Sequence, residues 1–175
     1  MSEILIIYST TDGHTRLICK HIRDLLTGYG NLVTLVSVEQ SDTLNITHYD
    51  KLIIGASIRY GKHSKAVYQF IDKNQETLEN KPSAFFSVNL VARKPGKNSP
   101  DTNPYFRKFI NQIPWKPDSV AVFAGKLNYP IYNFIDKQII RLIMWITKGP
   151  TDPDTVQEYT DWQQVESFAI TINDL

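Results

Sequence analysis

A short apolar run that ends in a loop of hydroxyl side chains constrains the fold of this chain most. Residues 3–8 (EILIIY) are almost continuously apolar and rich in β-branched side chains, which is typical of a strand buried on both faces. Residues 9–16 (STTDGHTR) follow, and from His14 to Leu26 apolar residues recur at spacings of three and four, as in a helix. Because the first N–H groups of a helix lack backbone partners, this strand, loop and helix start together predict an anion site.

The loop lacks the two common nucleotide fingerprints. It has no lysine in a GxxxxGKS/T arrangement and no GxGxxG, so neither a P-loop nor a dinucleotide site is indicated. Neutral hydroxyls and free amides suit a phosphate monoester instead. Ser, Thr, Asp and Gly are also common helix caps, so the loop taken alone leaves a purely structural role open.

Apolar runs alternate with helical patterns along the rest of the chain. Further strands are expected at residues 33–38, 50–57, 83–89 and 119–125, and further helices at residues 64–78, 105–112 and 161–172. Buried strands that alternate with helices predict an α/β fold, a doubly wound parallel sheet covered on both faces. With 175 residues, one domain over residues 1–175 is expected.

Two stretches interrupt this alternation. Residues 90–104 form a loop rich in Pro, Lys and Asn, and residues 126–153 form an insertion between the fifth strand and the closing helix. Within the insertion, residues 132–148 have a helical pattern with a basic stripe and a broad apolar face that includes Met144 and Trp145. Such a helix suits a membrane interface, the wall of a hydrophobic pocket, or the protein's own core, and the pattern does not choose among them.

Charge is distributed unevenly, although the net charge is only +1. Residues 93–148 carry ten basic and three acidic side chains, whereas residues 149–175 carry six acidic and no basic ones. Either the basic segment meets an anionic partner such as membrane headgroups, an acidic ligand or nucleic acid, or the two segments face each other in the fold. The absence of a transmembrane-length apolar run and of a signal-like start favours the cytoplasm, and the single cysteine, Cys19, excludes an internal disulfide.

In open α/β sheets, ligands bind outside the carboxyl ends of the strands, where the strand order reverses. The loops expected there are residues 9–15, 57–61 and 87–93, which offer hydroxyls, an arginine beside an aromatic ring, and an asparagine with several backbone amides. No His/Cys cluster has metal-ligand spacing and no GxSxG elbow is present, so neither a metal site nor a nucleophilic site is expected. A chain that has no acid–base machinery of its own suits a cofactor that carries the chemistry.

Three further segments make the pattern more specific: GASIRYG (55–61), PSAFFSVNLVARKP (82–95) and YTDW (159–162). Together with the first loop they resemble the bacterial menaquinone-dependent protoporphyrinogen IX dehydrogenases, a flavodoxin-like family, through essentially the whole chain. The resemblance implies a five-stranded parallel sheet of order 2-1-3-4-5 with a helical insertion near the fifth strand. It also implies FMN as cofactor and oxidation of protoporphyrinogen IX to protoporphyrin IX, in haem biosynthesis, with menaquinone or ubiquinone as electron acceptor.

The resemblance also suggests roles for individual residues. The FMN phosphate would be held by Ser9, Thr10, Thr11, Asp12, Gly13, His14 and Thr15. The flavin ring would be flanked by Ser57, Ile58, Arg59, Tyr60 and Gly61, and its edge approached by Ser87, Val88, Asn89 and Leu90. Flavin N5 would abstract hydride, so no catalytic side chain is assigned, and the protein would position the macrocycle. Arg59 is the first candidate to meet a substrate carboxylate, followed by Arg93, Lys94 and Lys97.

Other functions remain open at this stage. An electron-carrying flavodoxin is expected to be strongly acidic, a flavodoxin-fold NAD(P)H:quinone reductase would need a nicotinamide site, and a membrane-surface adaptor would leave the phosphate loop unexplained. The resemblance implies peripheral contact with the cytoplasmic face of the inner membrane and no nucleic-acid partner. The sequence leaves the oligomeric state open, a homo-oligomer included.

Overall fold

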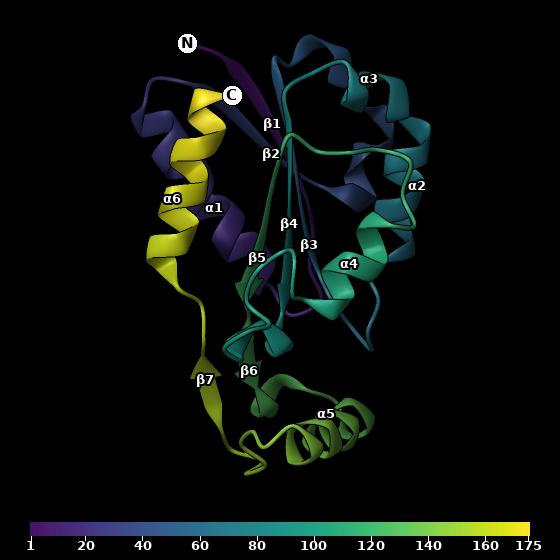
Figure 1. Cartoon of the computed structure of the whole chain (residues 1–175), viewed down its shortest axis with the longest axis vertical. Helices are drawn as coiled ribbons and strands as arrows, with labels where there is room; N and C mark the ends of the chain where they lie inside the picture. The colour runs from purple at the N-terminus through teal and green to yellow at the C-terminus, as the bar shows by residue number, and fades with distance from the viewer.

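The computed structural model describes residues 1–175 and contains a five-stranded parallel sheet with helices on both faces (Figure 1). Its strands are β1 (Glu3–Ser9), β2 (Leu32–Ser37), β3 (Lys51–Ser57), β4 (Ser83–Asn89) and β5 (Ser119–Ala124). They pair in the order β2-β1-β3-β4-β5. The predicted fold class and strand order are therefore confirmed.

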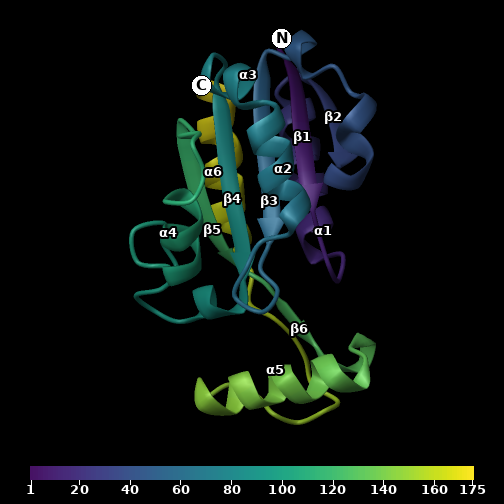
Figure 2. The same ribbon diagram turned by 90° about the vertical axis from the view of Figure 1, so that its right-hand side faces the viewer.

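Two helices cover one face of the sheet and three cover the other (Figure 2). On one face lie α1 (His14–Gly28) and α6 (Trp162–Asp174), and on the other lie α2 (Lys65–Lys73), α3 (Gln75–Glu79) and α4 (Pro104–Ile110). Short 3₁₀ turns span Val38–Thr43, Ile46–His48, Leu90–Arg93 and Tyr129–Ile131. Both termini lie at the amino end of the sheet strands, away from the insertion.

The burial of both sheet faces explains why the strands are continuously apolar. Leu5 and Ile7 join a buried cluster with α2 and α4, whereas Ile4 and Ile6 join a second cluster with α1 and α6. Because successive strand residues point to opposite faces, each position of β1 needs an apolar side chain. Cys19, on α1, is buried in the second cluster.

One predicted helix is divided in the structure. Residues 64–78 were expected to form a single helix, but α2 ends at Lys73 and α3 begins at Gln75. Between them the amide of Asn74 donates through Nδ2 to the carbonyl oxygen of Phe70, 2.8 Å away. Asparagine competes with the helical backbone in this way, so it ends α2 although the apolar spacing continues to Leu78.

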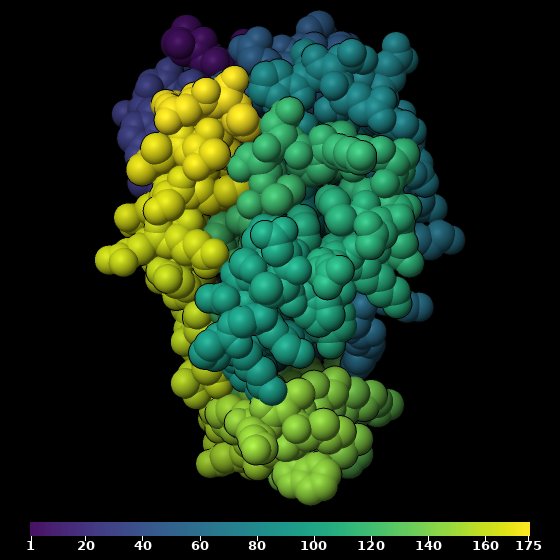
Figure 3. All heavy atoms as spheres, in the orientation of Figure 1, coloured from purple at the N-terminus to yellow at the C-terminus, as the bar shows by residue number.

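The insertion, expected over residues 126–153, extends to Glu158 in the structure and forms a small unit of its own beyond the carboxyl ends of the sheet strands. Strands β6 (Lys126–Asn128) and β7 (Val156–Glu158) pair antiparallel and carry α5 (Phe134–Ile146) between them. A third buried cluster of Leu127, Tyr129, Tyr132, Ile140 and Met144 holds this unit together. Figure 3 shows it in yellow-green as a separate mass at the bottom of the molecule. None of the helices is both long and apolar enough to cross a bilayer.

Candidate functional site

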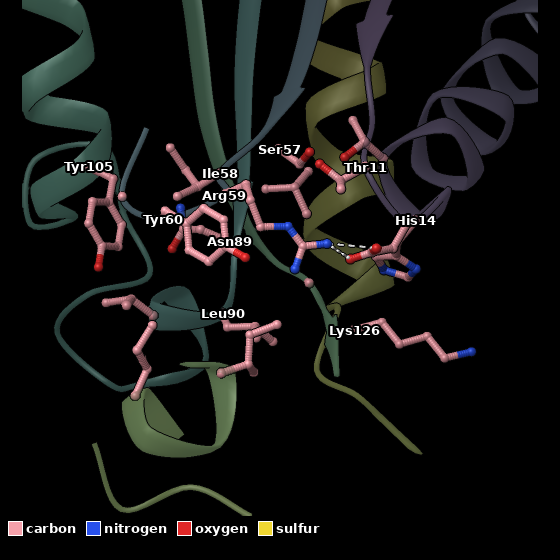
Figure 4. Close-up of a pocket in the computed structure, with 18 of the residues that line it drawn as sticks. Thr11, His14, Ser57, Ile58, Arg59, Tyr60, Asn89, Leu90, Tyr105 and Lys126 are labelled. Carbon is pink, nitrogen blue, oxygen red and sulfur yellow. Dashed lines mark hydrogen bonds and ion pairs between the residues drawn. The ribbon is translucent and has the colours of Figure 1, made fainter. Parts of the chain in front are cut away.

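The three loops expected at the carboxyl ends of β1, β3 and β4 surround one cavity of about 450 Å³ (Figure 4). This volume falls within the range of small-molecule and cofactor sites. Of the predicted site residues, those that line the cavity are Thr10, Thr11, Asp12, His14, Thr15, Ser57, Ile58, Arg59, Tyr60, Gly61, Val88, Asn89 and Leu90. The structure thus brings together residues that lie up to 80 positions apart in the sequence.

Three predicted site residues, Ser9, Gly13 and Ser87, do not line the cavity. Ser9 is the buried last residue of β1, and Ser87 is fully buried in β4, where its hydroxyl lies 3.0 Å from Nε2 of His63. Gly13 caps α1 in the left-handed conformation, with φ of +87°, which only glycine adopts freely. Its N–H donates to the hydroxyl of Thr10, so Gly13 shapes the loop instead of facing the cavity.

The start of α1 is built to receive an anion. The backbone N–H groups of His14, Thr15 and Arg16 donate to no group in the protein, and no side chain caps the helix. The hydroxyl of Thr15 is buried, lines the cavity and has no hydrogen-bond partner. A buried hydroxyl without a partner costs free energy, and no group of the protein accepts from these donors. The phosphate of FMN would supply the missing acceptors, so the donors fit this cofactor.

His14 is held by a chain of two hydrogen bonds. Its Nε2 lies 2.6 Å from the hydroxyl of Thr160, and that hydroxyl donates to the carbonyl oxygen of Ala124, 2.8 Å away. Since the single proton of Thr160 is used on Ala124, His14 must donate through Nε2–H. Burial lowers the pKa of His14, with an opposing effect of Glu158, and therefore favours a neutral ring whose Nδ1 is an acceptor.

The loop after β3 makes a tight turn that sets Arg59 and Tyr60 at the cavity. Arg59 and Lys62 exchange both backbone hydrogen bonds, at 2.9 and 3.1 Å. Between them Tyr60 has φ of +51° and Gly61 φ of +75°, a conformation that a tyrosine rarely adopts. Backbone held in this region is common at ligand sites, and here it presents the Tyr60 ring to the cavity.

Arg59 forms an ion pair with Asp12. Its Nη2 lies 2.6 and 2.7 Å from the two carboxylate oxygens of Asp12, and its guanidinium lies 5.4 Å from the centre of the Tyr132 ring. Arg59 and Asp12 are 21% and 32% exposed. The pair joins the loop after β1 to the loop after β3. Through its contact with Tyr132, Arg59 also contacts the insertion.

The far end of the cavity is apolar and comes from the insertion and the loop after β4. Lining residues that the sequence analysis did not place at the site are Val91, Tyr105, Gly125, Lys126, Tyr132, Ile140 and Ile143, and of these Val91, Ile140 and Ile143 lie at the apolar end. Met144, one of the two suggested wall residues, does line the cavity, whereas Trp145 is 71% exposed. Of the suggested carboxylate partners, Arg59 and Arg93 line the cavity and Lys94 and Lys97 do not.

A buried polar network supports the loop after β4. Oδ1 of Asn89 accepts hydrogen bonds from the Ala92 amide and from Nδ2 of Asn103, at 3.0 and 3.1 Å. Behind it His63 packs 4.4 Å from the centre of the Phe109 ring, and burial lowers its pKa to about 3. His63 is thus neutral and structural, and it does not line the cavity.

A model described as the flavodoxin domain matches residues 5–154. This chain belongs to the flavodoxin-domain family. Within it, the chain is 44% identical over 167 residues to protoporphyrinogen IX dehydrogenase (quinone) of Escherichia coli (strain K12), covering 95% of this chain and 92% of that protein. It is 46% identical over 168 residues to the protein of the same name from Leishmania major, covering 95% of this chain and 73% of the relative.

Solved structures agree on the fold of this flavodoxin-family chain. A flavodoxin from the domain Archaea superimposes with a TM-score of 0.54 at 13% identity, covering 98% of this chain and 96% of the flavodoxin. The fold likeness and the two curated relatives confirm the family resemblance inferred from the loops.

Proposed function

We propose that this protein is an FMN-dependent oxidoreductase that oxidises protoporphyrinogen IX to protoporphyrin IX. It passes the electrons to a quinone, for which menaquinone is the first candidate. The observation that carries the proposal is the two-part cavity, with donors for a phosphate at one end and apolar walls at the other. The near full-length similarity to proteins named protoporphyrinogen IX dehydrogenase (quinone) supports it. A flavodoxin that only carries electrons binds no large apolar substrate, so it does not require the apolar end.

The polar end would hold the cofactor. The free amides at the start of α1 and the hydroxyls of Thr10, Thr11 and Thr15 would donate to the phosphate oxygens. Tyr60, from one loop, and Asn89 and Leu90, from another, would flank the ring and its edge. When bound, FMN supplies a hydride acceptor, and three two-electron oxidations convert the porphyrinogen to the porphyrin.

The apolar end would place the substrate against the cofactor. Apolar side chains from two elements line this end and would contact the macrocycle from two sides. They are Leu90 and Val91 of the loop after β4, and Ile140, Ile143 and Met144 of α5. By excluding water and fixing orientation, such walls lower the entropic part of the barrier without an acid or base of their own. Near the polar end, Asp12 is ion-paired with Arg59, burial lowers the pKa of His14, and Lys126 is a further charged side chain.

We further propose that α5 docks on an anionic membrane surface. Its Ile140 and Met144 face the protein, and the opposite side of the helix is apolar and exposed. That side consists of Phe134, Ile135, Ile139, Leu142, Trp145 and Ile146. Helical spacing puts Lys137 and Arg141 between the buried and exposed faces, at the level where lipid headgroups would lie.

Two basic side chains of α5, Lys137 and Arg141, support this partner. None of the four ion pairs joins residues 93–148 to the acidic residues 149–175, so the two segments do not neutralise each other through close contacts. Lys126 and Glu158 are opposite each other in the β6–β7 pair but form no ion pair. The unit of residues 126–158 carries four basic and four acidic side chains, so the attraction of anionic headgroups to α5 would rest on Lys137 and Arg141 at the edge of its apolar face.

The activity is tested anaerobically with FMN-loaded protein, protoporphyrinogen IX and a menaquinone analogue, by following porphyrin fluorescence. Quinone-dependent fluorescence above the protein-free control is the expected result. Oxidation of NADPH by quinone without turnover of porphyrinogen would show a quinone reductase instead. Flavin binding with turnover of neither donor would leave an electron carrier.

Membrane docking is tested by flotation with phosphatidylcholine vesicles that contain or lack phosphatidylglycerol. We expect binding only to the anionic vesicles, and loss of binding in the variant Ile135→Gln/Trp145→Gln. Ile170→Gln is the matched control, because Ile170 is an exposed apolar residue on α6, at the other end of the molecule. Equal flotation of the double variant would exclude docking through α5, and a concentration-dependent dimer that the double variant abolishes would identify a second copy as the partner.

A further inference from the structure

Arg93 lies where the loop after β4 meets the end of α5. Its Nη1 donates to the carbonyl oxygen of Leu90 at 2.8 Å. Its Nη2 donates to the carbonyl and hydroxyl oxygens of Thr147, the residue that caps α5, at 3.2 and 2.8 Å. Nε–H has no acceptor in the protein, and the side chain lines the cavity.

The positive charge of Arg93 has no counter-charge. Arg93 takes part in none of the ion pairs, and its three acceptors are neutral oxygens. The charge of Arg59, by contrast, is neutralised by Asp12. A partly buried guanidinium beside apolar walls is costly unless an anion joins it, so Arg93 is the cavity arginine that lacks an anion.

The other unpaired cation of the cavity belongs to its polar end. Lys126 extends from the side where His14 lies, and it contributes to the lowered pKa of that histidine (Figure 4). Arg93 instead donates a hydrogen bond to Leu90. It also lies close to Met144, since both side chains surround the Cα of Gly149 and would touch a methyl group added there. Each end of the cavity therefore has one free cation, and the apolar end has the arginine.

We propose that Arg93 is a specificity-determining residue that binds a carboxylate of the apolar substrate. The inference rests on the proposed function and selects a different arginine from Arg59, which the sequence alone favoured. The ligand class is a large apolar molecule with carboxylate side chains, which the apolar walls and the single guanidinium would hold together. A charge-assisted hydrogen bond in a partly dry site contributes both affinity and orientation.

A purely structural role has to be separated from this one. Arg93 also fastens the carboxyl end of α5, where cations are favoured by the helix dipole. Thr147→Val removes one of its acceptors while it leaves the charge in place. Loosening of α5 would weaken every ligand of the apolar end alike, whereas loss of a carboxylate contact would weaken only ligands that carry a carboxylate.

The experiment compares the binding of protoporphyrin IX and of its dimethyl ester to the FMN-loaded protein in one detergent buffer, by porphyrin fluorescence anisotropy. We expect the wild type to prefer the diacid, and Arg93→Gln to lose about tenfold in diacid affinity with little change for the ester. Arg93→Lys keeps part of the preference because it keeps the charge. Thr147→Val keeps the ratio of the two affinities.

Lys97→Gln is the charge-matched control, because Lys97 lies on the same segment, is exposed and does not line the cavity. A diacid preference in Arg93→Gln equal to that of the wild type would overturn the proposal. The proposal would also be overturned if Arg93→Gln and Thr147→Val each lowered the affinities for the diacid and the ester equally. Arg93 would then only hold the end of α5 in place. Failure of the wild type to bind either porphyrin would instead overturn the proposed function itself, and this inference with it.

Discussion

Asp12 and Arg59 form an ion pair across the mouth of the cavity, between two loops that lie 47 residues apart in the sequence. Asp12 belongs to the loop that would receive the phosphate, so its carboxylate would lie close to the bound anion. Arg59 compensates this carboxylate and also lies over Tyr132, which links both loops to the insertion. The pair therefore connects the loop after β1 with the loop after β3 and, through Tyr132, with the insertion.

Asp12→Asn is expected to tighten FMN binding. The substitution removes a negative charge next to the phosphate and frees Arg59 to interact with it. Because the pair is partly exposed, the change should be about 1 kcal/mol or less, roughly fivefold in the dissociation constant. Titration of the apoprotein by quenching of FMN fluorescence measures it.

Asp42→Asn is the control for that experiment, because it breaks the more exposed pair with Lys73 far from the cavity. We expect no change in FMN affinity there. Weaker FMN binding in Asp12→Asn would mean that the pair organises the loop more than it repels the phosphate.

Thr15→Val is expected to separate cofactor binding from folding. The Thr15 hydroxyl has no partner in the protein, so its removal should leave the free energy of unfolding of the apoprotein unchanged or slightly higher. FMN affinity should fall by about tenfold or more, since a hydrogen bond to a charged phosphate contributes roughly 1.5–3 kcal/mol. Urea unfolding and FMN titration measure the two effects.

The control for Thr15→Val is Thr171→Val, which removes an exposed helical hydroxyl on α6. It should leave FMN affinity as it is. Destabilisation of the apoprotein by Thr15→Val with unchanged FMN binding would show that this hydroxyl does not meet the phosphate.

The sequence predicted the loops at the strand ends of the site because the apolar pattern of each strand is local in the sequence. Residues 9–15 and 57–61 follow strands whose burial on both faces leaves a clear apolar run, so the start of each loop is readable. The positions of Ser9, Gly13 and Ser87 show the limit of this reasoning. A motif identifies a loop, but whether a side chain faces the cavity depends on backbone conformation and on partners such as His63.

The apolar end of the site was only partly predictable. Strands β6 and β7 have three residues each and form only because they pair with each other across 30 positions, which leaves no local signal. The helical pattern of α5 was evident, but its apolar residues surround most of the helix. Only tertiary packing decides that Met144 faces the cavity and Trp145 faces outward.

His63 should make the protein less stable as the pH falls. Burial lowers the pKa of His63 in the folded state to about 3, below its ordinary value of 6.5, so the unfolded state binds the proton more tightly. The contribution is present above pH 6.5 and is lost between pH 6.5 and 3, by up to about 1.4 kcal/mol per pH unit. Urea midpoints at pH 6.5, 5.5 and 5 should fall less steeply in His63→Gln than in the wild type.

His48→Gln is the matched control, because His48 is exposed and belongs to none of the buried clusters. Its stability should follow the wild-type dependence on pH. Parallel pH curves for His63→Gln and the wild type would mean that other groups cause the acid sensitivity.

Gly55→Ala should destabilise the core beneath the cavity. A methyl group at Gly55 would lie 2.7 and 2.8 Å from Cε1 and Cε2 of Phe86 and closer still to Cζ. Phe86 cannot withdraw easily, because it is fully buried and packs against Phe123 and Phe168. We expect a loss of about 2 kcal/mol in the free energy of unfolding, measured by urea denaturation.

The clash also predicts compensation between the two residues. Phe86→Leu alone creates space and should destabilise, but Gly55→Ala/Phe86→Leu should lose less than the sum of the single variants by about 1 kcal/mol. Gly28→Ala is the control, because no atom lies within 4 Å of a methyl group at that helical position. Additive losses in the double variant would mean that strand β3 shifts to absorb the methyl group, and that the Phe86 ring stays in place.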